Sequence, residues 1–190
     1  MSKKLSEMSL EELWQLFPIY LTEHNDSWAL WCAEEELNLI KYLPTNQVMR
    51  ISHIGSTAVK GIWAKPIVDI LVEIAPESDM QKMKPILEKI GYLCMSEGSG
   101  RLSFNKGYTE NGFAERIFHL HLRKAGDNDE LYFRDYLNAH PDVAKEYERL
   151  KLSLWKQYEH NRDGYTESKT DFVKEYTKKA KVEFADRYTL

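Results

Sequence analysis

Asp69 is the residue whose chemistry most needs an explanation, because it occurs within an apolar run over 67–72 that is typical of a buried strand. An ionised carboxylate there loses its hydration unless a cation, a metal ion or several hydrogen bonds compensate for it. A second strand pattern, over 118–122, carries His119 and His121 on one face, roughly 7 Å apart, and apolar residues on the other. If the two strands are neighbours, both imidazoles converge with Asp69 on one cleft.

The two histidines have two interpretations. Neutral imidazoles ligate metal ions and exchange protons near neutral pH, so His119 and His121 could hold a divalent ion together with Asp69. Compared with carboxylates, imidazoles shift the preference from Mg²⁺ toward softer ions such as Mn²⁺ or Zn²⁺. The plainer interpretation is that the histidines are polar residues on a solvated sheet face, and that backbone N–H groups or Lys65 satisfy Asp69 as a structural carboxylate.

A candidate anion site precedes Asp69 in the sequence. Residues 48–54 predict a strand, and Gly55, Ser56 and Thr57 predict the start of a short helix with the serine or the threonine as its N-cap. Unpaired N–H groups at a helix start favour a phosphate or a carboxylate, although an isolated Gly-Ser pair is more often only a turn. Lys65 follows after a short spacer and places a positive charge near the same pocket. Two more cations flank a glycine-rich loop and are candidate phosphate ligands unless they are merely solvated: Arg101 and Lys106.

Together these motifs resemble the GrpB family, a branch of the nucleotidyltransferase superfamily. The superfamily pattern is a hydrophobic-Gly-(Gly/Ser) turn followed by Asp-hydrophobic-(Asp/Glu)-hydrophobic. Residues 54–56 and 69–70 match this pattern, whereas Leu71 stands where a second acid is expected and Lys60 stands where the family usually has Pro. Further segments that resemble the family are His119–His121, 133–137, His140 with Pro141, and 165–172.

The resemblance implies a nucleotidyltransferase-like fold and two classes of function. Nucleotidyltransferases use two or three carboxylates to hold divalent ions that clamp a triphosphate. Here Asp69 is the one convincing carboxylate, because Glu73 lies about 13 Å further along the strand. The first class is therefore an enzyme that transfers a nucleotidyl group from a nucleoside triphosphate to an acceptor, with His119 and His121 in metal binding or in acid–base catalysis beside Asp69 and Ser56. The second is a non-catalytic nucleotide- or anion-binding module with an incomplete metal site, and a metal-dependent phosphohydrolase is a third option.

Composition indicates the number of domains, the compartment and the class of partner to expect. The chain has 190 residues and a net charge of −4, which predicts one domain and argues against a main role in gripping a nucleic-acid backbone. No apolar run approaches the roughly 20 residues of a membrane span, and the N-terminal residues 1–5 lead into acids rather than a signal-peptide core. Cys32 and Cys94 predict reduced, packed thiols. We expect a cytoplasmic protein whose partner is a nucleotide or another phosphate-containing small molecule.

The elements that position these residues predict an α+β fold, in which a small mixed sheet packs with helices. Residues 1–45 predict two helices, with Ser9 and Glu12 as a capping box for the first and Asp26 as the cap of the second. In the second helix the expected buried stripe is Leu30, Ala33, Leu37 and Ile40.

Residues 46–125 predict the sheet core. It contains the two strands described above, a helix capped by Ser78 and stopped by Gly91, a short strand over 92–95, and a hairpin of strands over 102–106 and 116–123.

Residues 126–190 predict a helical section. One helix ends near Ala139, the next starts at Pro141, and Gly164 separates the latter from the last helix. Two ion pairs are predicted in this section, Arg134 with Asp135 and Lys169 with Asp171.

Overall fold

The computed structural model describes residues 3–189. Met1, Ser2 and Leu190 lie outside the described residues, so the expectation for the N-terminal residues 1–5 falls partly outside them. Between residues 3 and 189, none of the helices combines the length and the apolar character that a membrane crossing needs. Both cysteines are free thiols, with Cys32 buried, as the sequence predicts. That the whole chain makes one domain stays a prediction.

Five strands form one mixed sheet in the order β1-β2-β5-β4-β3. Their bounds are β1 Val48–Ile54, β2 Val68–Ile74, β3 Leu93–Gly98, β4 Arg101–Thr109 and β5 Gly112–Lys124. β2 and β5 pair in parallel, and the other neighbours are antiparallel. The α+β architecture with a small mixed sheet is therefore confirmed, and so is the predicted adjacency of the Asp69 strand and the histidine strand.

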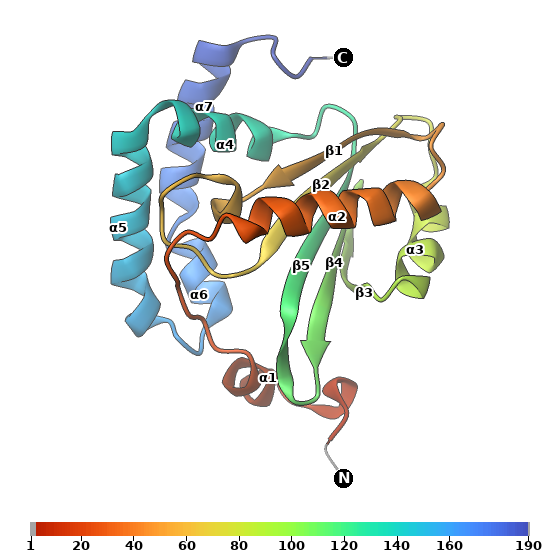
Figure 1. Ribbon diagram of the computed structural model, residues 1–190, viewed down its shortest axis with the longest axis horizontal. Helices are drawn as coiled ribbons and strands as arrows, with labels where there is room; N and C mark the ends of the chain where they lie inside the picture. Colours follow the sequence, from red (N-terminus) through yellow and green to blue (C-terminus); the bar gives the residue numbers. More distant parts are fainter. Residues whose placement is uncertain (1–2, 190) are drawn as a thin grey trace.

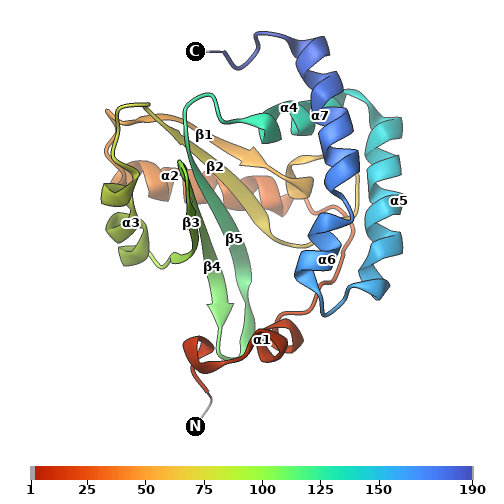
Figure 2. The same ribbon diagram turned by 180° about the vertical axis from the view of Figure 1, so that it is seen from behind.

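Helices pack on both faces of this sheet. Their bounds are η1 Leu5–Glu7, α1 Leu10–Leu16, α2 Ser27–Tyr42, η2 Ser56–Ala58, α3 Met80–Lys89, α4 Asp129–Ala139, α5 Pro141–Gln157, α6 Arg162–Glu167 and α7 Thr170–Phe184. Figure 1 shows α2 lying across the near face, and in the reversed view of Figure 2 α6 and α7 come forward on the other side. Both views place α1 at the end of the β4–β5 hairpin.

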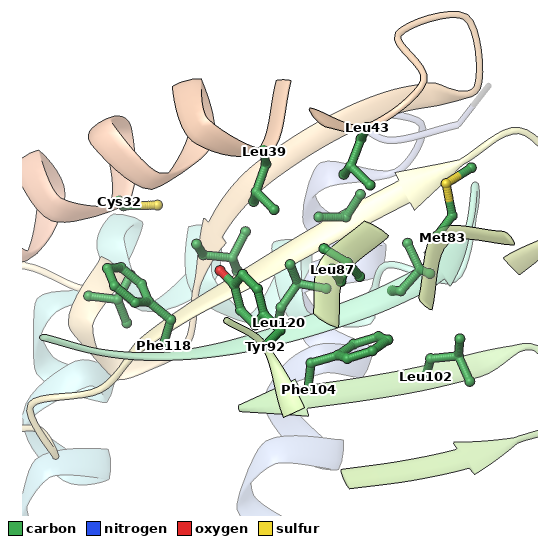
Figure 3. Packing of buried hydrophobic residues seen from close by; sticks show 14 of the residues in the cluster. Cys32, Leu39, Leu43, Met83, Leu87, Tyr92, Leu102, Phe104, Phe118 and Leu120 are labelled. Carbon is green, nitrogen blue, oxygen red and sulfur yellow. The ribbon is translucent and has the colours of Figure 1, made fainter. Parts of the chain in front are cut away.

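The main hydrophobic core lies between the sheet and the helices α2 and α3. Alternation along β5 sends Phe118, Leu120 and Leu122 into this core, each at most 3% exposed. Leu39 of α2 and Leu87 of α3 meet them from the helical side (Figure 3). Since side chains alternate along a strand, the residues between them point to the opposite face. His119 and His121 therefore lie on the face opposite α2 and α3.

The predicted buried stripe of α2 is wrong. Leu30, Leu37 and Ile40 are 64%, 70% and 44% exposed, and the helix instead buries the face of Trp28, Cys32, Glu35 and Leu39. An apolar pattern does not predict a buried glutamate. Glu35 is nevertheless buried, because its carboxylate accepts hydrogen bonds from Tyr92 Oη at 3.0 Å and from Lys106 Nζ at 2.8 Å. A buried acid with two donors fixes the rotation of this helix.

Several predicted boundaries also need correction. The capping box of Ser9 and Glu12 is confirmed. Asp26 makes no side-chain cap, because Asn25 Oδ1 accepts from the Ser27 N–H instead. The cap of α3 is Asp79, one residue after the predicted Ser78, and Gly164 lies inside the short helix α6 rather than between helices. Both hairpin strands are longer than predicted.

Candidate functional site

Asp69 and both histidines meet on the face of the sheet that lies away from α2 and α3. In the parallel β2–β5 pair, Asp69 is directly opposite His119, and Leu71 is opposite His121. His119 Nδ1 lies 3.4 Å and His121 Nε2 lies 3.5 Å from the same oxygen, Asp69 Oδ1. The convergence predicted from strand alternation is thus present in the structure.

The far nitrogens of the two imidazoles are also bonded, and these bonds indicate which nitrogen of each carries the hydrogen. An arginine can only donate, so His121 Nδ1 accepts from Arg123 Nη2 at 3.4 Å and its Nε2 carries the proton. Tyr108 Oη accepts from Arg162 Nη1 at 2.9 Å, which leaves its hydrogen to donate to His119 Nε2 at 2.8 Å. His119 Nδ1 then carries a proton toward Asp69.

The result is a chain of hydrogen bonds from Arg162 and Arg123 that ends on one carboxylate. Burial by itself would raise the pKa of Asp69, but the hydrogen bonds from His119 and His121 outweigh it and hold that pKa well below its usual range. Burial also lowers the pKa of His119, so its imidazole is neutral near pH 7. Asp69 is an ionised acceptor, and His119 is a neutral donor to it.

The hydrogen-bond assignment bears on the predicted metal site. A metal ligand must offer a lone pair, whereas the nitrogens of His119 and His121 that face Asp69 carry hydrogens. Among residues 3–189, no group of three or more His, Cys, Asp or Glu side chains is arranged to hold a metal ion. The metal-ligand roles of Asp69, His119 and His121 stay a prediction.

The Gly55 turn faces Asp69 across the cleft. Gly55 has φ +72° and is itself the N-cap of η2, so the predicted serine or threonine cap is wrong. Thr57 is buried, and its hydroxyl donates to the Ile67 carbonyl at 3.2 Å and accepts from His53 Nε2 at 2.9 Å. Because η2 has only three residues, its dipole is small. Other groups must supply most of the positive charge that a bound anion would need.

Those groups are three lysines around a deep lobe of about 190 Å³. The sequence predicts Lys65 there, but not Lys151 of α5 or Lys169 immediately before α7. Instead of making the predicted pair with Asp171, Lys169 lines this lobe. The remaining lining residues that bear on a ligand are Gly55, Ser56, Thr57, Asp69, His119, Tyr147 and Tyr165. Four of the predicted phosphate ligands, Gly55, Ser56, Thr57 and Lys65, are thus brought together.

No carboxylate within 4 Å neutralises these lysines in the described part of the chain. Burial lowers the pKa of Lys65 to about 8 and those of Lys151 and Lys169 to about 7. Neighbouring cations lower these values further, while Glu148 opposes the shift of Lys151 and Asp69 opposes those of Lys65 and Lys169. The hydroxyl of Tyr165, which lines the same lobe, is buried without a hydrogen-bond partner among residues 3–189. The deep lobe therefore combines excess positive charge with an unsatisfied donor.

A larger lobe of about 720 Å³ adjoins the deep one and shares Gly55, Ser56, Asp69 and Tyr147 with it. Its walls are the aromatic and aliphatic side chains of Phe133, Leu137, Tyr147 and Val173, with His121, Arg101, Glu130 and several lysines of α7 around them. Asp69 lies where the lobes meet.

The two other predicted phosphate ligands are placed differently. Arg101 lines the larger lobe, and both Nε and Nη2 bond to Asp127 at 2.7 and 2.6 Å, so its charge is already paired. Lys106 is not at the cleft: it points to the opposite face of the sheet, where it pairs with Glu35 and lies over the Phe118 ring. The predicted pair of Arg134 and Asp135 is confirmed at 2.7 Å.

The chain belongs to the GrpB family, since the model of that family, described as GrpB protein, matches residues 18–179. It is 38% identical over 164 residues to the glutamate-rich protein GrpB of Alkalihalophilus pseudofirmus, covering 83% of this chain and 92% of that protein. It is 31% identical over 186 residues to the UPF0157 protein YqkA of Bacillus subtilis, covering 94% of this chain and 52% of that protein.

Among solved structures, the conserved protein GrpB from Enterococcus faecalis superposes with a TM-score of 0.74 at 30% identity, covering 87% of this chain and 99% of that one. A weaker likeness is to the Cid1 poly(U) polymerase, with a TM-score of 0.48 and 11% identity over 68% of this chain and 45% of that one. At that level, neither fold nor reaction follows from the likeness.

Proposed function

We propose that the deep lobe binds the phosphate chain of a nucleotide or a related phosphate-containing small molecule, and that the larger lobe holds an acceptor to which a nucleotidyl group is transferred. The observation that carries this proposal is the set of three lysines without carboxylate partners, Lys65, Lys151 and Lys169, around one small cavity. The proposed location is the cytoplasm, where nucleoside triphosphates occur.

The charge of the deep lobe favours a polyanion over a single carboxylate. Three buried ammonium groups repel one another, and burial adds a desolvation cost to each charged form. A di- or triphosphate would offset the positive charge of all three lysines at once, and its oxygens would accept from the free hydroxyl of Tyr165. The N–H groups at the start of η2 would add two donors.

In the proposed reaction, Asp69 orients the acceptor from its place between the two lobes. An acceptor hydroxyl in the larger lobe would donate a hydrogen bond to Asp69. This bond would turn a lone pair of the hydroxyl oxygen toward the α-phosphorus. The new P–O bond forms as the bond to pyrophosphate breaks, pyrophosphate leaves with its electron pair, and the hydroxyl proton passes to Asp69 and then to solvent. Because the pKa of Asp69 is low, positioning contributes more than basicity.

A second candidate is a non-catalytic nucleotide-binding module. Two observations favour it. In the assigned tautomers both imidazoles turn an N–H group toward Asp69 rather than a lone pair that could bind a metal ion, and Leu71 occupies the position of a second acid. A divalent ion that arrived with a nucleotide would find Asp69 as its carboxylate at the meeting point of the lobes.

Calorimetric titration with inorganic triphosphate and with ATP, each with and without Mg²⁺, tests the binding. We expect saturable binding that is weaker in a Lys169→Met variant. A Lys156→Met control, on the exposed side of α5, should bind as tightly as the unmodified protein. Equal binding by both variants would contradict the proposed site.

Transfer is tested separately. The protein is incubated with each nucleoside triphosphate, labelled at its α-phosphate, together with a bacterial small-molecule extract. A labelled product formed with release of pyrophosphate, and lost in an Asp69→Asn variant, supports the enzyme. Tight binding without any product from the unmodified protein supports the module.

A further inference from the structure

A second cavity lies away from the cleft, between the N-terminal helices, the edge of the sheet and α6. Its volume is about 370 Å³, near the lower end of the range for small-molecule sites. Most of its wall is apolar and comes from Leu10, Leu13, Trp14, Phe17, Leu93 and Met95. Leu10, Leu93 and Met95 are 56%, 51% and 59% exposed, so the apolar wall continues to the surface.

Arg162 is the cation of this cavity. Its Nη1 donates to Tyr108 Oη at 2.9 Å, and Tyr108 also lines the cavity. Its Nε and Nη2 atoms are buried and have no hydrogen-bond partner in the described part of the chain. Leaving charged N–H groups buried and unpaired costs free energy that a bound acceptor would recover.

The free atoms of Arg162 form one complete edge of the guanidinium. Nε and Nη2 lie side by side and donate in parallel, which is the geometry that grips both oxygens of a carboxylate. The guanidinium carbon lies 5.3 Å from the centre of the Tyr108 ring and 5.8 Å from that of Phe113. Stacking on rings holds the plane of the group but satisfies none of its in-plane N–H bonds.

We infer that this cavity binds a small carboxylic acid with an apolar body, whose carboxylate pairs with the Nε–Nη2 edge of Arg162. The single guanidinium and the absence of lysine from the cavity wall match one negative charge, in contrast to the lysine-rich deep lobe. The apolar wall matches an aryl or alkyl body. Arg162 and Tyr108 also belong to the hydrogen-bond chain that ends at Asp69, but the cavity takes a different class of ligand from the proposed nucleotide site, so binding at each can be measured separately.

The test is a calorimetric titration with phenylacetate, hydrocinnamate and octanoate, and with the amide of each acid as a neutral analogue of nearly the same shape. Titration up to about 10 mM detects dissociation constants in the millimolar range. We expect at least one acid to bind and its amide to bind at least tenfold more weakly. Equal binding of acid and amide, or no binding by any of the three acids, overturns the inference.

Two variants locate the binding. Arg162→Gln removes the charge and should abolish the preference for acid over amide. Because a change at a buried arginine risks the fold, Met95→Asp provides a test at an exposed wall position, where a negative charge should weaken acid binding at least tenfold. Met49→Asp is the matched control, since Met49 is 54% exposed on β1 and outside the cavity. Equal effects of the two methionine variants would also overturn the site.

Discussion

Gly55 lies directly against the carboxylate of Asp69: a Cβ atom at Gly55 would be 2.4 Å from Asp69 Oδ2. The positive φ of +72° disfavours any other residue for a second reason. The position of the Asp69 carboxylate on β2 therefore requires glycine at residue 55 of the predicted glycine-serine turn.

Gly55→Ala is expected to destabilise the protein by about 3 kcal/mol, from backbone strain plus the contact with Asp69. Gly61→Ala is the matched control, because Gly61 has the same φ of +72° and a Cβ atom added there would meet no other atom within 4 Å. Urea unfolding should show that Gly61→Ala costs only about 1 kcal/mol. Equal losses would mean that the contact with Asp69 is unimportant.

Lys169→Met should lower the affinity for inorganic triphosphate at least tenfold, since a charged donor to an anion contributes about 1.5–3 kcal/mol. The same change removes one of three mutually repelling cations, so the free energy of unfolding without ligand should stay the same or rise. Calorimetry and urea unfolding measure the two effects. A large loss of stability would show that the lysine is structural instead.

Triphosphate binding should take up protons. In the empty protein at pH 8, Lys65, Lys151 and Lys169 are partly deprotonated, because their pKa values are lowered to about 8, 7 and 7. A bound polyanion raises these values again, so affinity should fall as the pH increases from 7 to 9. Titrations in two buffers of different ionisation enthalpy give the number of protons, and an uptake of zero at pH 8 would exclude this coupling.

The same lysines set the sign of the pH dependence of folding. Their ordinary pKa is 10.5, so between pH 7 and this value the unfolded chain binds more protons than the folded one. Their contribution to the free energy of unfolding therefore increases with pH across this window. In Lys169→Met that increase should be smaller, which urea unfolding at pH 7 and pH 9 can measure.

The tautomers of the two histidines can be read by nitrogen NMR. At pH 7 we expect a neutral His119 protonated at Nδ1, and His121 with a proton at Nε2. Mn²⁺ or Zn²⁺ alone should therefore give no stabilisation through this group. A thermal shift with either ion that is lost when both histidines are changed to Gln would contradict this assignment and support the predicted metal site.

Local pattern predicts the parts of the fold that depend on neighbours in sequence. Alternation in β5 predicts the shared face of His119 and His121, and the apolar run around Asp69 predicts β2; the pairing of these strands confirms both. The rotation of α2 could not be obtained in this way. It depends on Glu35 meeting Lys106, which is 71 residues away, and no periodic pattern records such a contact.

The lysines of the deep lobe escape sequence-based prediction for a similar reason. Lys151 is 2% exposed on α5, and Lys169 precedes a different helix. Each looks like an ordinary surface cation in the sequence. Their shared role depends on how α5 and α7 pack beside the Gly55 turn, and tertiary packing sets that distance.

The hydrogen-bond chain through Asp69 has a direction. Both halves point inward, from Arg162 through Tyr108 and His119 on one side, and from Arg123 through His121 on the other. An arginine cannot accept, so neither half can be reversed to conduct a proton out through the protein. Both hydrogen-bond chains end on the Asp69 carboxylate and cannot pass a proton on through the protein. Any proton that Asp69 gains must therefore enter and leave through the mouth of the cleft, where the substrate would be.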